Sequence, residues 1–293
     1  QNDWTVEAEL KSTGAASSDF FGRSVAVAGD TILVGAFGDD ETAPGAGAAY
    51  VFRNAGGWSQ EAKLRADDGT ASDFFGSAVA LDGVRALIGA RGESASMLAA
   101  GAAYVFAHDG AGWVQQQKLV AADAGTYDSF GVAVALHGAE VFIGAQGSDS
   151  LGANAGAAYL FRFDGNAWNE YQVLREVAGS TDDQYGFSVG LSSSAAVVGG
   201  YFGSFTGIAD VVWRFDPDCN ANAQRDVCDV TAGLSVDCNV NLIPDDCETL
   251  SAGDFNANGA AAEAGDMFGF SQCCSGPGAL PVPGGGICPA TCL

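Results

Sequence analysis

Two twelve-residue blocks near the C-terminus carry the residues whose types and spacing could do chemistry. They read DCNANAQRDVCD over 218–229 and DCNVNLIPDDCE over 237–248. In each block, oxygen-bearing side chains occupy positions 1, 3, 5, 9 and 12, and position 7 would offer its backbone carbonyl. These residues are Asp218, Asn220, Asn222, Gln224, Asp226 and Asp229 in the first block, and Asp237, Asn239, Asn241, Ile243, Asp245 and Glu248 in the second. Ca²⁺ takes six to eight oxygen ligands, and a loop with this spacing supplies them. We therefore expect both blocks to bind calcium; the alternative is two solvated turns rich in Asp and Asn, held by disulfides.

The turn position of both blocks departs from a strong calcium loop. Position 6, where glycine allows the sharp turn, is Ala223 in the first block and Leu242 in the second. Asparagine in place of aspartate also lowers the charge of the ligand set. We expect weak affinity, about 10⁻⁴–10⁻³ M, which is the range of extracellular modules.

A third segment, GDFNANGAAAEAGDMFGF over 253–270, repeats the start of such a loop. Asp254, Asn256 and Asn258 stand at positions 1, 3 and 5, and Gly259 stands at position 6. The carboxylates that follow are out of register with positions 9 and 12. Whether metal occupies this third site is left open.

All eight cysteines lie beyond residue 218: Cys219, Cys228, Cys238, Cys247, Cys273, Cys274, Cys288 and Cys292. An even number of cysteines in a segment without a core of its own is typical of disulfides formed in an oxidising compartment. We expect local pairing within 219–247 and within 273–292, although eight cysteines allow 105 connectivities. A chain that begins at Gln1 fits a mature N-terminus after signal removal. These features predict an extracellular protein, secreted or held at the cell surface.

The two blocks resemble thrombospondin type 3 repeats, and more closely the DCNxNxxPDxC repeats of secreted planctomycete proteins. The segment 253–270 looks like a dockerin-type loop and helix. Dockerins bind cohesins, but one degenerate loop does not make a cohesin-binding surface, so no such partner is predicted. The resemblance implies calcium as the cofactor of this region.

The rest of the chain repeats one motif. Trp4, Trp58, Trp113 and Trp168 follow one another at intervals of 54, 55 and 55 residues. Two further landmarks, an FG-like pair and a GA-like pair, keep the same intervals. They are Phe21-Gly22, Phe75-Gly76, Phe130-Gly131 and Tyr185-Gly186, and Gly35-Ala36, Gly89-Ala90, Gly144-Ala145 and Gly199-Gly200. A period near fifty indicates a propeller or a solenoid.

Each copy contains four strand-like runs, which in the first copy are Trp4–Leu10, Arg23–Ala28, Thr31–Gly35 and Ala48–Phe52. Gly29-Asp30 between the second and third runs predicts a two-residue hairpin turn. The third and fourth runs are apolar without alternation, as expected for strands covered on both faces. Four-stranded sheets stacked face to face meet that requirement, and they are the blades of a propeller.

The FG pair, the apolar run that ends in GA, and the GAAYVF run resemble the FG-GAP repeat of integrin-like β-propellers. They are clear in three copies, and the fourth is degenerate. The resemblance implies an all-β fold: a β-propeller of four FG-GAP-like four-stranded blades, followed by a small disulfide-rich calcium-loop module with little regular structure. Family members usually have seven blades, and many carry a DxDxDG calcium hairpin. This sequence has no such hairpin, so no calcium site is expected in the blades.

The boundaries follow from these patterns. We place the propeller at 1–216, with repeats at about 3–56, 57–111, 112–166 and 167–216. A tandem calcium-loop module follows at 217–250, and a dockerin-like segment with a tail rich in Gly, Pro and Cys occupies 251–293. Four repeats either close into a ring at the small end of propeller sizes, or form an open array whose edge strands need cover. We expect closure.

Charge and hydropathy exclude several classes of function. A net charge of −24 argues against nucleic acid and anionic membrane surfaces as partners, and no run of eighteen apolar residues predicts a membrane span. The stretch GFSVG at 186–190 matches the G-x-S-x-G pattern of hydrolases, but that pattern needs a turn between a strand and a helix. Its counterparts in the other copies fall inside strands, so no catalytic residue is predicted and the chain is not expected to be an enzyme.

We expect a secreted structural or interaction protein that self-assembles into a homo-oligomer, an extracellular filament or a surface layer. The propeller and the calcium-stabilised C-terminal module would make the contacts, because two unlike surfaces on one chain give a heterologous interface. The alternative is a monomeric cell-adhesion module that binds a protein or a glycan through the propeller loops.

Overall fold

The computed structural model describes residues 4–14, 16–176, 181–193, 195–201 and 207–213, together with two short strands near the C-terminus. The chain divides into two units, Gln1–Trp213 and Arg214–Leu293. In the second unit, β16 (Leu280–Pro281) pairs antiparallel with β17 (Ile287–Cys288). All regular secondary structure of the described residues is β, and none of them forms a helix long and apolar enough to span a membrane.

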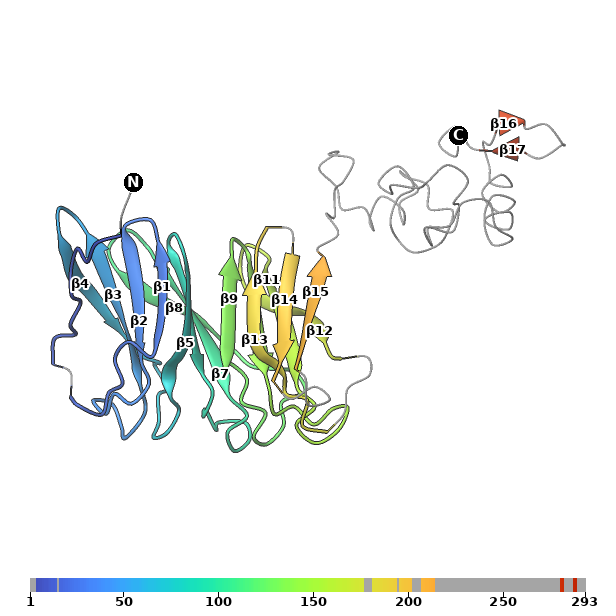
Figure 1. The fold of residues 1–293 in the computed structure, drawn as a ribbon, viewed down its shortest axis with the longest axis horizontal. Helices are drawn as coiled ribbons and strands as arrows, with labels where there is room; N and C mark the ends of the chain where they lie inside the picture. Colours follow the sequence, from blue (N-terminus) through green and yellow to red (C-terminus); the bar gives the residue numbers. More distant parts are fainter. Residues whose placement is uncertain are drawn as a thin grey trace. The chain divides into compact units, whose positions relative to one another are not determined.

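The first unit contains four antiparallel sheets, and each is formed by strands that follow one another along the chain (Figure 1). The first sheet consists of β1 (Ser24–Ala28), β2 (Thr31–Ala36), β3 (Ala48–Asn54) and β4 (Trp58–Leu64). The second consists of β5 (Phe75–Asp82), β6 (Arg85–Ala90), β7 (Ala102–His108) and β8 (Trp113–Leu119). The third consists of β9 (Ala133–His137), β10 (Glu140–Ala145), β11 (Ala157–Phe163) and β12 (Trp168–Leu174). The fourth consists of β13 (Tyr185–Leu191), β14 (Ala195–Gly200) and β15 (Ile208–Trp213).

The predicted hairpins and apolar strands are confirmed. Ala28 pairs with Thr31 across the two-residue turn between β1 and β2. On β2, the adjacent residues Leu33 and Val34 point to opposite faces and are both buried, at 0% and 3% exposure. Both faces of this strand are therefore covered, which is why its sequence lacks the alternation of a half-exposed strand.

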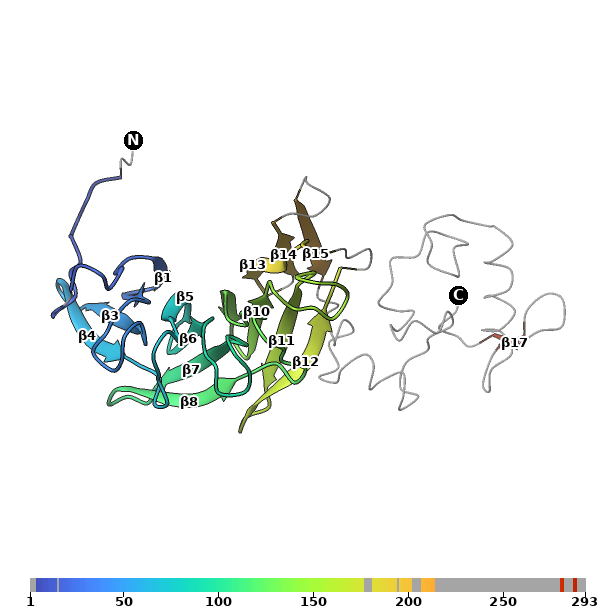
Figure 2. The ribbon, with the colours of Figure 1, turned by 90° about the horizontal axis from the view of Figure 1, so that it is seen from below.

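The sheets pack in chain order: the first on the second, the second on the third, and the third on the fourth. Figure 2 shows them side by side, with β1–β4 at one end of the row and β13–β15 at the other. Three apolar clusters fill the spaces between successive sheets, and a fourth lies on the outer side of the first sheet. The closed four-bladed ring stays a prediction.

Two expectations about strands are corrected. Trp4–Leu10 is described without strand pairing, and the fourth sheet has three described strands rather than four. Both differences have the same cause. The run that opens each repeat at tryptophan is the outer strand of the sheet before it, as β4 pairs with β3 and β8 with β7. Within the part of the chain that the structure describes, the first such run therefore has no preceding sheet to join, and the fourth sheet has no following run to complete it.

Candidate functional site

Neighbouring sheets meet through the aromatic-glycine turn at the start of each following sheet. Phe75 is 1% exposed, and its backbone forms a parallel bridge with Gly47, which lies just before β3 of the first sheet. The Phe75 amide donates to the carbonyl of Ala46 at 3.0 Å, and its ring meets the edge of Tyr104 with centroids 5.5 Å apart. The same bridge joins Gly101 to Phe130 and Gly156 to Tyr185. The FG landmark is thus the point where one sheet is attached to the next.

Glycines are required on both sides of this contact. Gly76 has a φ of +87°, and a Cβ there would lie 2.3 Å from the carbonyl oxygen of Ala48. Gly35 on β2 approaches the same turn, and its Cβ would lie 2.0 Å from the carbonyl oxygen of Gly76. Because a Cβ does not fit at such distances, the two positions must be glycine together. The FG and GA landmarks keep the same spacing along the chain for this reason.

Each sheet has two unlike faces, which we name by the neighbour they meet. The forward face packs on the next sheet in the sequence, and in the first sheet it carries Leu33 and Val51, both fully buried. The backward face packs on the preceding sheet, and in the second sheet it carries Ile88, with Val79 and Leu81 beside it. Forward and backward faces therefore form the apolar contact between successive sheets.

The backward face of the first sheet has no preceding sheet among the described residues. Val25 lies opposite Val34, and Val27 lies opposite Ile32, so both valines are on this face. Val25 and Val27 are 67% and 69% exposed. Phe21 stacks its edge on Tyr50 with centroids 5.5 Å apart, as Phe75 does on Tyr104, but it remains half-buried. On the same face Val34, Tyr50 and Phe52 are buried, with Leu10 packed on their cluster, so the exposed part of the face is the β1 edge.

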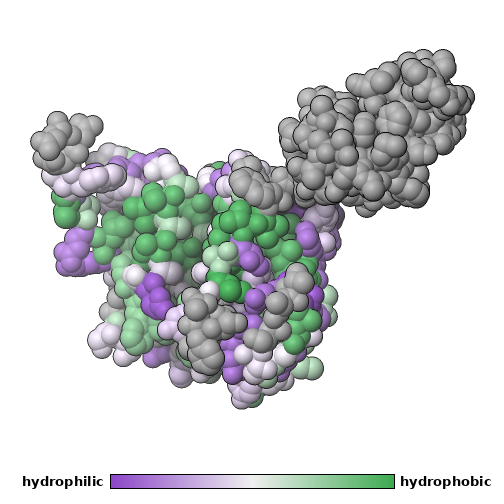
Figure 3. Space-filling view, turned by 45° about the vertical axis from the view of Figure 1, so that its right-hand side comes forward, coloured by the Kyte–Doolittle hydropathy of each residue, from purple (hydrophilic) through white to green (hydrophobic). Residues whose placement is uncertain are grey.

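The forward face of the fourth sheet is exposed in the same way. Val197 pairs with Val211 across β14 and β15, as Leu33 pairs with Val51 in the first sheet. The two valines of the fourth sheet are 40% and 54% exposed. In the space-filling view, apolar residues form broad patches on the side of the first unit that faces the reader (Figure 3).

The missing outer strand of the fourth sheet corresponds to a run at the other end of the unit. In the repeat, Trp4–Leu10 is the counterpart of β4, β8 and β12. Trp4 is fully exposed, whereas its counterpart Trp168 is 3% exposed. Among the described residues, one strand-like run therefore has no sheet, and one sheet lacks the outer strand that the other three have.

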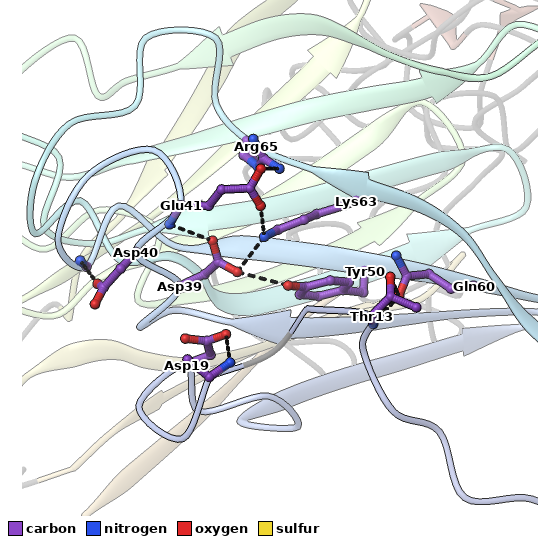
Figure 4. A network of polar contacts seen from close by, with 11 residues as sticks. Thr13, Asp19, Asp39, Asp40, Glu41, Tyr50, Gln60, Lys63 and Arg65 are labelled. Atoms are coloured by element: carbon purple, nitrogen blue, oxygen red, sulfur yellow. Dashed lines mark hydrogen bonds and ion pairs between the residues drawn. The ribbon is translucent and has the colours of Figure 1, made fainter.

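Polar bonds hold the chain that follows Trp4–Leu10 on the first sheet (Figure 4). The amide and hydroxyl of Thr13 both donate to Oε1 of Gln60, at 2.9 and 3.1 Å. The amide of Asp67 donates to Gln115 in the same way at 3.1 Å, and this bond holds the chain after β4 on the second sheet. The residues after Trp4–Leu10 are thus anchored to the first sheet in the way that the residues after β4 are anchored to the second.

A buried ionic cluster ties β3 to β4 (Figure 4). Asp39, 2% exposed, accepts a hydrogen bond from the Tyr50 hydroxyl at 2.9 Å and an ion pair from Lys63 at 2.6 Å, and Lys63 also reaches Glu41 at 2.6 Å. Burial raises the pKa of Asp39, but the bonds from Lys63 and Tyr50 outweigh it and the pKa lies below its usual value. The pKa of Lys63 is raised, because its bonds to the carboxylates outweigh burial. We therefore assign this cluster a role in stabilising the first sheet and not a role in a reaction.

A buried aspartate shapes the turn before each FG pair. Oδ2 of Asp73 accepts the amide of Thr70 at 2.6 Å, and Oδ2 of Asp128 accepts the amide of Gly125 at 2.7 Å. Burial raises the pKa of both carboxyls, and the amide bonds offset it in part. Sequence reasoning missed these residues, although an aspartate stands two residues before each aromatic-glycine pair.

The predicted metal and disulfide residues lie outside the described residues. This applies to the ligands of 218–229 and 237–248, to Asp254, Asn256 and Asn258, and to the cysteines, of which only the backbone of Cys288 is described, in β17. Within the described part of the chain, no cluster of three or more His, Cys, Asp or Glu side chains could hold a metal ion. The GFSVG stretch lies inside β13, as predicted, so Ser188 has the backbone of a strand residue and not of a nucleophile turn.

A family model described as "FG-GAP repeat" matches residues 4–52, 58–106 and 113–161. The chain belongs to the FG-GAP repeat family. The three matched segments start at the tryptophans and end in the GAAYVF-type strands, and the fourth repeat is outside the match. A search of curated proteins finds no match. Among solved structures, the crystal structure of Saccharomyces cerevisiae Sqt1 is similar at a TM-score of 0.37 and 8% identity, over 62% of this chain and 43% of that one. The match thus covers less than half of the length of Sqt1.

Proposed function

We propose that this protein is a non-enzymatic structural protein that assembles from copies of itself outside the cell. The supporting observation is a set of exposed valines on the two end faces of the sheet array, on which no further sheet packs among the described residues. Val25 and Val27 at one end, and Val197 and Val211 at the other, occupy positions that face a neighbouring sheet elsewhere in the array. Contiguous apolar surface of this kind is typical of protein–protein interfaces. Because the two faces differ, they form a heterologous contact, which generates a ring or a filament of copies.

A closed four-bladed ring would cover the same two faces within one chain. That arrangement, expected from the sequence, leaves no apolar end face for a partner. It would fit the second candidate function, a monomeric adhesion module that binds a protein or glycan through its loops. The two arrangements differ in the mass of the particle in solution, so the choice between them is open to direct measurement.

We assign calcium and disulfides to the C-terminal unit within this proposal. The support is the sequence alone: oxygen ligands at the spacing of a calcium loop in 218–229 and 237–248, and eight cysteines confined to this unit. Calcium bound there would neutralise part of the net charge of −24, which otherwise opposes association of identical copies. Chelation should therefore weaken the assembly.

Light scattering on the purified full-length chain tests the proposal, under non-reducing conditions with and without a calcium chelator. Particles of many copies that shrink on chelation support calcium-dependent self-assembly. Large particles whose size does not change with the chelator support self-assembly and exclude a role for calcium in it. A monomer in both conditions, at every concentration tested, contradicts the proposal and favours the adhesion module.

A further inference from the structure

We propose that Trp4–Leu10 of one copy becomes the fourth strand of the β13–β15 sheet of a second copy. In this contact, the backward face of the first sheet of one molecule packs on the forward face of the fourth sheet of the next. The inference rests on the proposed self-assembly and names its interface. The contact reproduces between chains the arrangement that already joins successive sheets within one chain.

The segment is placed for this role by the residues that follow it. Leu10 packs on the backward face of the first sheet beside Phe21, and Thr13 is bonded to Gln60. At the next interface, Leu64 of β4 is buried between the first and second sheets, and Asp67 is bonded to Gln115. The C-terminal end of the run, at Leu10, is therefore held on the first sheet as the end of β4 is held against the second, while Trp4 and Val6 remain exposed.

The register of the added strand follows from the repeat. Ala49 pairs with Leu64, Val51 with Ala62, and Phe52 with Gln60 in the first sheet. The corresponding pairs are Ala209 with Leu10, Val211 with Ala8, and Val212 with Val6. Three apolar pairs would form, and the free backbone groups of the β15 edge would gain partners.

The backbone turns at both ends already have the conformation of the contact. Gly22 has a φ of +90° and no atom within 4 Å of its Cβ position, whereas the Cβ position of Gly76 is 2.3 Å from a carbonyl oxygen. Gly207, the counterpart of Gly47, also keeps a positive φ, at +71°, with its nearest atom 3.6 Å away. The positive φ by itself already favours glycine at both positions, so what distinguishes Gly22 from Gly76 is only the empty space beside it. A second sheet could approach Gly22 as closely as the first sheet approaches Gly76.

A second copy is favoured over the same chain by the order of the sheets. The first and fourth sheets stand at opposite ends of the row, and each space between successive sheets is filled by an apolar cluster (Figure 2). Closing the ring within one chain would require these filled contacts to be rearranged. A second copy can dock without changing any of them.

One pair in the predicted register is unfavourable and provides a sharp test. Glu9 would lie opposite Asp210, where the first and second sheets place Lys63 opposite Tyr50 and Lys118 opposite Tyr104. Two carboxylates directly across a strand pair repel. Glu9→Lys should therefore strengthen self-association. Glu7→Lys makes the same charge change at a bulge position without an opposite residue, since its counterpart Glu61 has none.

The experiment measures the self-association of full-length variants by light scattering over a concentration series. Val27→Glu places a charge on the backward face and should weaken association about tenfold or more, since loss of a buried valine contact and burial of a charge each oppose docking. Val84→Glu, in the exposed turn between β5 and β6, is the matched control and should leave it unchanged. Glu9→Lys should strengthen association several-fold more than Glu7→Lys does.

Three results would overturn the inference. If Val27→Glu forms the same particles as the wild type, the proposed function stands, but the interface does not lie on this face. Equal effects of Glu9→Lys and Glu7→Lys would exclude the predicted register. A wild-type monomer in which amide exchange of residues 5–10 is slow would place the strand in its own chain, and would contradict the proposed function as well.

Discussion

At Asp39, burial and charge shift the pKa of one carboxyl in opposite directions. Burial raises the pKa, but the bonds from Lys63 and Tyr50 lower it below the ordinary 3.8. A carboxyl whose pKa is lower in the folded state stabilises the protein above the unfolded pKa, and this stabilisation is lost as the pH falls through the folded value. The residue therefore links the acid stability of the first sheet to one ion pair.

Asp39→Asn should lower the free energy of unfolding by about 3 kcal/mol at neutral pH, because it removes the buried partner of Lys63 and leaves only the exposed Glu41 paired with it. The difference from the wild type should shrink as the pH falls below 3.8. Urea unfolding followed by tryptophan fluorescence at several pH values measures it. Glu41→Gln is the control, since Glu41 is exposed, and its effect should be smaller at every pH. An Asp39→Asn difference that is constant with pH would contradict the assignment.

Two equivalent glycines should behave differently on substitution. Gly22→Ala and Gly76→Ala share the cost of a positive φ, about 1–2 kcal/mol. Gly76→Ala also places a Cβ against the carbonyl oxygen of Ala48, so it should lower the free energy of unfolding by about 2 kcal/mol more than Gly22→Ala does. Thermal unfolding of the two variants makes the comparison. Equal losses of stability would mean that the FG turn of the first sheet is packed as tightly as that of the second.

At the scale of the strands, the same repeat position has two environments. Trp168 on β12 is buried at 3% exposure, and Trp4 is fully exposed. Trp168→Ala should lower the free energy of unfolding by about 3–5 kcal/mol, whereas Trp4→Ala should change it by less than about 0.5 kcal/mol at concentrations where the chain is monomeric. Calorimetry on both variants checks this. A large loss for Trp4→Ala in the monomer would indicate that the segment pairs within its own chain.

Much of the sheet array was predictable from the sequence, because its strands are specified locally. The turn at Gly29-Asp30 and the apolar run Thr31–Gly35 predict β1, β2 and their hairpin without reference to the rest of the chain. The partner of each tryptophan run was not predictable in the same way. A period of about 55 residues is unchanged when the frame is shifted by one strand, so it does not say whether Trp58–Leu64 ends one sheet or begins another. The exposure of Val25 and Val27 was missed for the same reason, since in sequence they match the covered Val79 and Leu81.

At the scale of the whole molecule, the apolar end faces and the net charge act against each other. The end faces favour association of copies, and thirty-six acidic residues against twelve basic ones oppose it. Within the first unit, Arg53, Lys63 and Lys118 form ion pairs with carboxylates of the same molecule, so their charges do not offset repulsion between molecules. Association should therefore depend on the ionic conditions as well as on the contacts.

Self-association should increase with salt even when calcium is removed. Raising the ionic strength from about 0.01 M to about 0.15 M shortens the screening length from about 30 Å to about 8 Å, which weakens repulsion between copies but leaves the apolar contact intact. Sedimentation in a series of sodium chloride concentrations with chelator present separates this effect from calcium binding. Glu9→Lys should associate at lower salt than the wild type, because it removes a repulsive pair from the interface itself. Association that falls with salt would show instead that attraction between opposite charges holds the copies together, and the apolar end faces would then not be the main contact.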